Sequence, residues 1–486
     1  MKHLALVSFA AACGASNTNT KPAVHVAASF EASSSIATSS PGNVTAAAAP
    51  DRSADEIAAL RAEGPAALAR LLKTYDALAA GDAKQRLGAT IDKVAGQRFA
   101  TVSRMYWYTD LEAAKAEAKQ TGKPILSLRM LGRLDEDLSC ANSRFFRTIL
   151  YSNATLGPWL RDHFVLHWSS ERNVPKVTID FGDGRVLERT VTGNSAHFVL
   201  DSSGRPLDVL PGLYAPSAFQ EELTKSLALA AQVGDKTDAE RRKLVIAYHA
   251  KRISDRSEQW QKLGGSVPVI YGRRGLLSSA DVDATVALAQ RATVSKAYIE
   301  VPDLRIVDVG SDPGALAPDL ELWAVIGQRL YHWGDPPVGA PAAADEASLN
   351  GFAFGRPPRE QAPRRAAPHA PTTPLHLLDA QSTSLVLALA NAPGAPPLDD
   401  ARKDQMLARL DQTLAADTAQ NEMQLRTQID SYFAYDSYGG DVTFGNLDEY
   451  IYANVFHTPA SDPWLGLLPR DAFTGLPADG VTTKAR

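Results

Sequence analysis

The chain has 486 residues, and because a single hydrophobic core stops growing beyond roughly 250–300 residues, two or more packed units are expected. Hydrophobic residues make up 45% and charged residues 22% of the chain, so most of it can bury enough apolar surface to fold. The formal net charge of −5 argues against a nucleic-acid groove, since phosphate binding needs a clustered basic surface. DNA and RNA are therefore not expected as partners.

The N-terminus has the pattern of an export signal. Lys2 precedes a short apolar run from Leu4 to Ala12, which is too short to span a bilayer and is typical of a secretory signal. The run continues into Cys13-Gly14 and resembles a bacterial lipobox, so residues 1–13 are expected to be a signal peptide with Cys13 as the lipidation site. An ordinary cleaved signal is the alternative.

Two segments precede the first domain. Residues 14–50 are rich in Ala, Ser, Thr and Asn and cannot offset their ordering entropy by burial, so we expect a flexible tether. Residues 51–99 are expected to form a helical lead-in, because apolar residues recur at helical spacing between Ala54 and Ala80. A break near Gly64-Pro65 predicts two amphipathic helices, which we expect to pack on the next domain.

Residues 100–235 alternate between helical and strand patterns. Asp110 can cap a first helix, and the turn residues Phe181 to Gly184 predict the tip of a hairpin. In chain order the expected elements are a helix over Leu111–Gln120, a strand over Ile125–Met130, a helix over Ser143–Tyr151, a strand over His163–Trp168, a hairpin over Val174–Thr192, strands over His197–Leu200 and Pro206–Leu210, and a helix over Ser217–Val233.

The remaining half has a mainly helical pattern. We expect a helical region over 236–334, a proline-rich linker over 335–374, and a helical C-terminal region over 375–486 that ends in an apolar, turn-rich tail. The expected helices are Asp238–Leu263, Ala280–Ala292, Asp319–Leu330, Leu375–Asn391 and Asp400–Phe433. Glu422 and Arg426 form an i,i+4 pair, which on a helix surface contributes only about 0.2–0.5 kcal/mol.

A series of short motifs runs through residues 100–235. They are Tyr106-Trp107-Tyr108, Asp110 to Lys119, Gly122-Lys123-Pro124 to Met130, Cys140-Ala141-Asn142-Ser143, and Gly193 to Asp201 with Gly204 and Gly212. In this order they resemble the thioredoxin superfamily, especially its exported bacterial members. The resemblance implies an α/β thioredoxin-like domain, with a central mixed sheet flanked by helices, followed by the mainly α-helical C-terminal region.

Cys140 is the residue for which chemistry is expected. A thiol at the start of a helix feels unpaired N–H groups and the positive end of the helix dipole, which favour its thiolate. The resemblance implies that Cys140 attacks a substrate disulfide, and that Asn142, Ser143, Ser195 and Ala196 bind the substrate. Ser143 occupies the position of the family's second cysteine, and Ala196 or Ser195 that of its cis-proline. Because a serine cannot resolve a mixed disulfide, only a monothiol mechanism is open.

Each candidate residue also has a purely structural explanation. Cys140 itself is equally explained as a partly buried small residue in a domain that kept the fold and lost the reaction. Arg144 and Arg147 could stabilise a thiolate, although such residues are more often solvated surface. His163 and His167 share one face of their predicted strand, but no third ligand is identifiable, so neither a metal site nor a cofactor is expected.

The sequence therefore predicts an exported protein of the cell envelope or periplasm, held at the membrane only by a lipid on Cys13. The first hypothesis is a thiol-disulfide oxidoreductase or isomerase that uses Cys140 in monothiol exchange with protein or small-molecule thiols and disulfides. The second is a non-catalytic thioredoxin-fold protein that binds partners as a scaffold.

Overall fold

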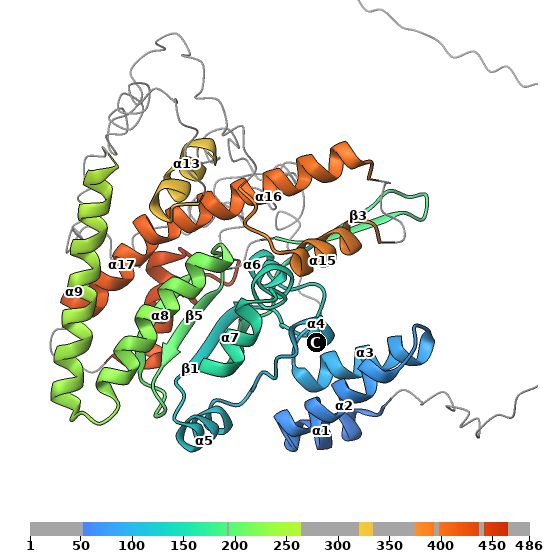
Figure 1. Ribbon diagram of the computed structural model, residues 1–486, viewed down its shortest axis with the longest axis horizontal. Helices are drawn as coiled ribbons and strands as arrows, with labels where there is room; N and C mark the ends of the chain where they lie inside the picture. Colours follow the sequence, from blue (N-terminus) through green and yellow to red (C-terminus); the bar gives the residue numbers. More distant parts are fainter. Residues whose placement is uncertain are drawn as a thin grey trace, which may run out of the picture. The chain divides into compact units, whose positions relative to one another are not determined.

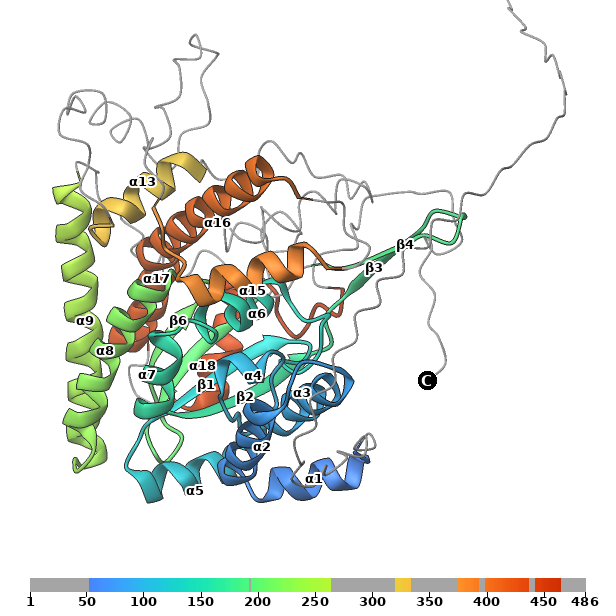
Figure 2. The same cartoon turned by 45° about the vertical axis from the view of Figure 1, so that its right-hand side comes forward.

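The computed structural model describes residues 52–191, 194–263, 320–333, 375–392, 398–436 and 442–464. The predicted signal, lipidation site, tether and proline-rich linker lie outside these residues, as does the predicted helix over Ala280–Ala292. Figures 1 and 2 show the chain in two orientations.

The described part of the chain begins with four helices: α1 (Ala54–Ala62), α2 (Pro65–Ala77), α3 (Asp82–Ala95) and the short α4 (Ala100–Ser103). The break between α1 and α2 falls at Gly64, whose φ of 73° favours glycine, with Pro65 opening α2. Arg61 donates to Trp107 O at 2.9 Å, and Trp168 Nε1 donates to Gly96 O at 2.8 Å. The lead-in is therefore packed on the sheet region, as predicted.

A mixed four-stranded sheet forms the centre, in the order β2-β1-β5-β6. Strand β1 (Ile125–Leu131) runs parallel to β2 (Val165–Arg172) and antiparallel to β5 (Ala196–Leu200), and β5 runs antiparallel to β6 (Pro206–Pro211). The two inner strands are almost entirely buried, because helices cover both faces of the sheet. The predicted mixed sheet flanked by helices is confirmed.

Helices connect β1 to its neighbours. Helix α5 (Leu111–Thr121) precedes β1, and Asp110 caps it by accepting the Glu112 N–H at 2.8 Å. Between β1 and β2 lie α6 (Ala141–Phe145), the π-helical turn η1 (Phe146–Leu150) and α7 (Leu156–His163). The predicted strand over His163–Trp168 begins later than expected, because His163 ends α7 instead.

The predicted hairpin is present as a separate two-stranded sheet. It consists of β3 (Lys176–Asp180) and β4 (Val186–Thr190), and Gly182 and Gly184 at its tip have φ values of 74° and 90°. Figure 2 shows the hairpin reaching away from the four-stranded sheet. Its base returns to the sheet region, where Thr190 is buried.

The closing helix and the C-terminal region are helical, as predicted. The elements are α8 (Pro216–Val233), α9 (Asp238–Lys262), α13 (Leu320–Leu330), α15 (Ala380–Ala390), α16 (Asp400–Gln420), η2 (Asn421–Leu425), α17 (Arg426–Ser431), η3 (Tyr432–Asp436), α18 (Phe444–Tyr450) and η4 (Ile451–Val455). Helix α13 crosses α16 (Figure 1), where Gly327 leaves no room for a side chain above the backbone of Ala415.

Alternation along β5 defines the two faces of the sheet. His197 contacts Phe146 of η1 and Phe219 of α8, whereas the next residue, Phe198, contacts Phe444 of α18. Since successive side chains on a strand point to opposite faces, η1 and α8 cover one face and α18 the other. The C-terminal helices therefore share the core of the sheet, and Leu414, Ile429, Phe433, Leu447 and Phe456 belong to the same buried cluster as Leu128 and Val199.

Candidate functional site

Cys140 lies where the chain passes from β1 into the next helix. It is the N-cap residue of α6, and its carbonyl accepts the Arg144 N–H at 3.2 Å. Its side chain makes no capping hydrogen bond to the helix. The thiol is therefore at a helix start, as predicted, but it is not bound by the N–H groups of that helix.

Two serine hydroxyls surround the sulfur. Cys140 Sγ lies 2.9 Å from Ser195 Oγ and 3.3 Å from Ser143 Oγ. Because β5 is antiparallel to β1, the end of β1 and the start of β5 meet at one edge of the sheet. The fold thereby brings together Cys140, Ser143 and Ser195, three of the predicted site residues.

The site is closed in this conformation. Cys140, Asn142, Ser143, Ser195 and Ala196 all have a relative exposure of 0%, so none of the predicted substrate-binding side chains meets solvent. Part of the cover comes from the base of the hairpin, where Thr190 Oγ1 donates to Ser139 O at 3.1 Å. An attacking thiol must be reachable, so exchange at Cys140 needs a conformation more open than this one.

A buried tyrosine–histidine pair lies close to the thiol and was missed by sequence reasoning. Tyr151 Oη is 2.6 Å from His197 Nε2, and both side chains are fully buried. Burial lowers the pKa of His197 to about 3 and raises the pKa of Tyr151, so both are neutral near pH 7. The pair is suited to hydrogen bonding and not to proton abstraction. His197 follows Ser195-Ala196 directly, which is the signal that could have indicated it.

Arg147 holds the loop before Cys140 and is not solvated surface. Its guanidinium donates to the carbonyl oxygens of Leu134, Glu136 and Asp137, with 3.1 Å to Leu134 O and 3.2 Å to Asp137 O. Only 2% of the residue is exposed, and burial lowers its pKa to about 10, so it stays charged. Its charge is close enough to Cys140 for the two groups to interact.

The acidic residues before Cys140 form ion pairs with arginines. Asp135 pairs with Arg133 at 2.7 Å, and Asp137 pairs with Arg98 at 2.8 Å. Neither carboxylate caps α6. Their effect on a thiolate at Cys140 is therefore partly offset by these two arginines.

The C-terminal segment 442–464 is attached to the loop that faces the sulfur. Tyr452 Oη donates to Asn194 O at 3.1 Å, and Asn194 Nδ2 donates to Phe456 O at 3.3 Å. Asn194 immediately precedes Ser195, the residue in contact with Cys140. Tyr452 is near enough to Cys140 to feel its charge, which contributes to the raised pKa of the tyrosine together with burial, the dominant cause.

An arginine shared by two carboxylates attaches the same segment to the sheet. Arg129 of β1 binds Asp448 Oδ2 of α18 through Nη2 at 2.6 Å and through Nε at 2.9 Å. The same Nη2 also binds Glu171 of β2. The side chains of Arg129, Glu171 and Asp448 are 17%, 19% and 10% exposed. Two acidic groups therefore compete for one cation in a largely buried place.

The two histidines considered as metal ligands are apart. His163 ends α7, stacks on Trp159 and binds Trp159 O at 2.8 Å. His167 lies within β2, with Nδ1 at 2.8 Å from Ser127 Oγ, and burial lowers its pKa to about 4. The expectation that both share one strand face is wrong, because the strand begins at Val165.

A second polar cluster, which we call the ionic network, joins β6, α8 and α9 to the C-terminal helices. Its members are buried charged side chains, with exposures from 0% to 8%: Asp208, Glu222, Arg252, Arg256, Glu422, Arg426 and Asp430. Arg426 binds Asp208 at 3.1 Å, Arg252 bridges Glu222 and Glu422, and Arg256 bridges Glu422 and Asp430. Glu422 and Arg426 are therefore buried, so the roughly 0.2–0.5 kcal/mol of a pair on a helix surface does not apply to them.

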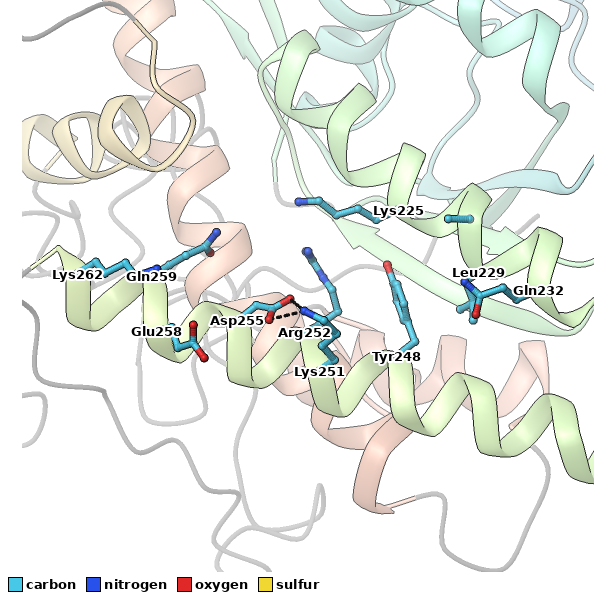
Figure 3. A pocket seen from close by; sticks show the side chains of 11 residues that line it. Lys225, Leu229, Gln232, Tyr248, Lys251, Arg252, Asp255, Glu258, Gln259 and Lys262 are labelled. Atoms are coloured by element: carbon cyan, nitrogen blue, oxygen red, sulfur yellow. Dashed lines mark hydrogen bonds and ion pairs between the residues drawn. The ribbon is translucent and has the colours of Figure 1, made fainter.

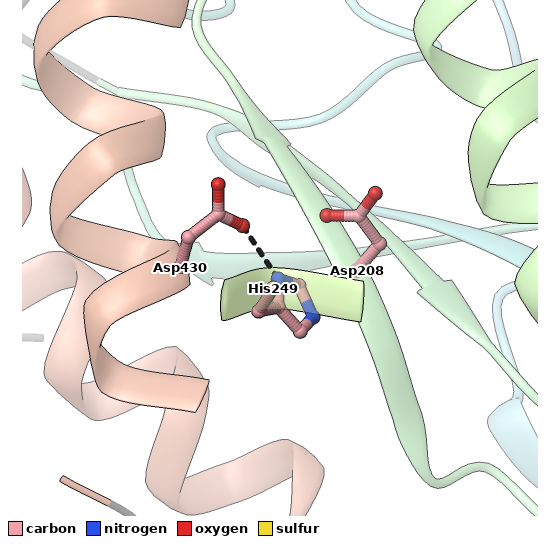
Figure 4. Close-up of side chains that lie close together, drawn as sticks. All are labelled: Asp208, His249 and Asp430. Atoms are coloured by element: carbon pink, nitrogen blue, oxygen red, sulfur yellow. Dashed lines mark hydrogen bonds and ion pairs between the residues drawn. The ribbon is translucent and has the colours of Figure 1, made fainter. Parts of the chain in front are cut away.

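Asp208, His249 and Asp430 are the one group of ligand-type side chains that the described residues bring close enough for a metal ion (Figure 4). Their atoms are already engaged. His249 Nε2 lies 2.9 Å from Leu207 O and Nδ1 lies 2.5 Å from Asp430 Oδ1, while Asp208 accepts from Ser226, Tyr248 and Arg426. Burial lowers the pKa of His249 to about 3, so the ring is neutral, and since a carbonyl oxygen cannot donate, its proton is on Nε2. The adjacent Arg256 and Arg426 also repel a cation, so the group does not fit a metal.

A groove of about 540 Å³ lies between α8 and α9 (Figure 3). Its lining includes Lys225, Lys251, Arg252 and Lys262. Lys251 pairs with Asp255 at 2.6 Å, Lys225 with Glu222 at 2.7 Å, and Arg252 with Glu222 and Glu422. Because three of its four basic side chains already have acidic partners, the groove shows no preference for an anionic ligand.

No family model, curated protein or solved structure matches this chain. Within the described parts of the chain, no helix combines the length and apolar character needed to cross a membrane. The arguments for function therefore depend on the geometry of the sites above.

Proposed function

We propose that this chain is a thioredoxin-like protein that carries out thiol-disulfide exchange through Cys140. The observation that carries the proposal is the contact between Cys140 Sγ and Ser195 Oγ at 2.9 Å. It joins the two motifs, Cys140 to Ser143 and Asn194 to Ala196, that the thioredoxin resemblance places around a substrate. The thiol stands at the start of α6, the position that the resemblance gives to the attacking cysteine.

The order and direction of the elements support the same proposal. A parallel β1-helix-β2 unit is followed by the antiparallel strands β5 and β6 and the closing helix α8. This succession follows the order of motifs that resembles the thioredoxin superfamily. The hairpin β3–β4 is an additional feature inserted between the two halves.

The residues present allow a monothiol cycle. Cys140 thiolate attacks one sulfur of a substrate disulfide, a new S–S bond forms, and the other substrate sulfur leaves as a thiolate that takes up a proton. A second thiol, from a small molecule or from the substrate itself, then attacks the mixed disulfide and restores Cys140. Electrons pass from that thiol to the substrate disulfide, and the protein undergoes no net oxidation. Ser143 can donate a hydrogen bond to the thiolate but cannot take part in the exchange.

The burial of Cys140 limits when this exchange can occur. Exchange is confined to openings of the structure, because Cys140 has no exposed surface in the closed state. The rate is then the product of the opening equilibrium and the chemical rate, when closing is faster than reaction.

The test uses Cys140 as the only thiol. Of the two cysteines, Cys13 is replaced in a Cys13→Ala chain, which is incubated with oxidised glutathione and followed by intact mass. We expect a glutathionyl adduct that forms in the folded protein, is released by reduced glutathione, and is absent from the Cys13→Ala, Cys140→Ser control. An adduct that forms only in urea, with none in the folded chain over days, would contradict the proposal.

A second function, a non-catalytic thioredoxin-fold scaffold in which Cys140 is structural, is favoured by the complete burial of all five predicted site residues. The same measurement separates the two functions. In the scaffold, the folded chain and the Cys140→Ser control remain equally unmodified.

We also propose that the protein is exported and lipid-anchored through Cys13, on the signal-like pattern at residues 1–13. Metabolic labelling with a palmitate analogue is expected to mark the natural chain and not Cys13→Ala. The matched control is Cys140→Ala, which should label as strongly as the natural chain. Equal labelling of the Cys13→Ala chain would exclude the anchor.

A further inference from the structure

The C-terminal segment 442–464 covers one face of the sheet and binds the loop beside the thiol. Leu447, Ile451, Val455 and Phe456 of this segment are buried in the core of the sheet. Tyr452 and Phe456 bind Asn194, next to the Ser195 that contacts the sulfur. Among the described residues, this segment is thus attached directly to the backbone edge at which a thioredoxin-like substrate would be held.

The attachment of the segment to the sheet has an unusual charge balance. Arg129 Nη2 binds both Asp448 and Glu171, so two carboxylates face one guanidinium. Among the described residues, Tyr452 and His167 also interact with this cluster. Burial raises the pKa of Tyr452 and lowers that of His167 to about 4, so both are neutral near pH 7. With both carboxylates ionised, the cluster has one uncompensated negative charge in a largely buried position. With one proton bound, it is neutral.

We propose that residues 442–464 form a lid over the Cys140 site, latched to the sheet by Asp448, Arg129 and Glu171, and that loss of the proton held by the two carboxyl groups loosens it. The inference deepens the proposed function by naming how the thiol is exposed. The lid concerns only whether reagents can reach the sulfur, so it can be tested whether or not Cys140 carries out disulfide exchange.

The direction of the pKa shift at Asp448 predicts that the closed state is more stable at low pH. Burial raises the pKa of Asp448 from 3.8 to about 6, with Arg129 lowering it and Glu171 raising it. A carboxyl group whose pKa is higher in the closed state binds its proton more tightly there. The contribution of Asp448 to closure is therefore complete below about pH 4 and is lost as the pH rises through about 6.

The experiment measures alkylation of Cys140 by iodoacetamide in the Cys13→Ala chain, by intact mass, between pH 5 and pH 8. Each rate is divided by that of the same chain carrying Asp448→Asn, so that the ionisation of the thiol itself cancels. We expect this ratio to rise about tenfold between pH 5 and pH 8, from the difference between the closed and open titrations of Asp448. The exposed Asp404→Asn is the matched control, and dividing by its rates should give a flat ratio. A ratio to Asp448→Asn that stays flat overturns the latch.

A second variant tests the lid without changing the charge. Tyr452→Phe removes the 3.1 Å hydrogen bond to Asn194 O and should raise alkylation about fivefold at every pH, the effect of one hydrogen bond of about 1 kcal/mol. Unchanged alkylation overturns the lid. If both variants behave as expected and the folded chain still forms no mixed disulfide, the lid stands and the proposed exchange function fails.

Discussion

Two of the buried polar clusters in the described residues, the one around Cys140 and the ionic network, differ in how they are built. The cluster around Cys140 is made of thiol and hydroxyl groups from residues 139–195, which carry no formal charge except when the thiol ionises. The ionic network holds buried carboxylates and guanidinium groups from residues 208–430. When a buried neutral group loses its partner, the fold loses one hydrogen bond. When a buried charged group loses its partner, the charge stays out of water without compensation, which costs considerably more free energy. The network should therefore tolerate substitution far less well than the cluster that carries the proposed chemistry.

The largest expected effect is at the centre of the network. Arg426→Met removes the cation that faces Asp208 and Glu422, and both side chains are buried. Breaking a buried pair on one side costs about 3–5 kcal/mol. Urea unfolding should show this loss.

The control for this substitution is Arg402→Met on the same helical run, where the side chain is 63% exposed. That change should shift the free energy of unfolding by less than about 0.5 kcal/mol. Losses of similar size at both positions would remove the contrast between a buried network and a solvated helix face.

The order of the elements was predictable from local pattern, and so was part of the site. The cap at Asp110, the break at Gly64-Pro65 and the hairpin all follow from signals a few residues long. The approach of Cys140 to Ser195 follows once β1 and β5 are placed side by side. Short-range chemistry thus determined most of the region between residues 100 and 235.

Burial by segments that are distant in the sequence was not predictable in the same way. An i,i+4 spacing such as that of Glu422 and Arg426 fits a surface pair and a buried pair equally, and here side chains of α8 and α9 bury it. The spacing of His249, Arg252 and Arg256 on one face of α9 is the signal that could have indicated a charged interface. Nothing local indicates that residues 442–464 bind next to Ser195, since that contact joins segments more than 250 residues apart.

A pH series tests a buried group that is neutral in the folded protein, His167. Burial lowers the pKa of His167 from 6.5 to about 4. Between these pH values the residue is protonated in the unfolded chain and neutral in the folded chain. Stability is then lost as the pH falls from about 6.5 to about 4, by up to about 3 kcal/mol. His167→Asn should remove this residue's share of the loss from the curve of unfolding free energy against pH, whereas His197 and His249, whose pKa values burial also lowers, keep theirs.

The matched control for the pH series is Ser127→Ala. It removes the hydroxyl 2.8 Å from His167 Nδ1 and costs about 1 kcal/mol, but it keeps the titrating ring. The slope between pH 4 and pH 6.5 should therefore be retained. A slope that His167→Asn leaves intact would assign the pH dependence to other groups.

The smallest effect is expected at the thiol itself, and its size bears on the contrast with the network. Ser195→Ala and Cys140→Ala each remove one end of the 2.9 Å contact, and each should lower the free energy of unfolding by about 1–2 kcal/mol, as for a buried neutral hydrogen bond. Their double variant should show a coupling of about 0.5–1.5 kcal/mol in chemical denaturation. If the coupling instead reached about 3 kcal/mol, the upper end for a hydrogen bond to a charged group, the sulfur would be ionised in the folded state. The neutral description of this cluster would then be wrong, and the thiolate needed for exchange would already be present under the closed lid.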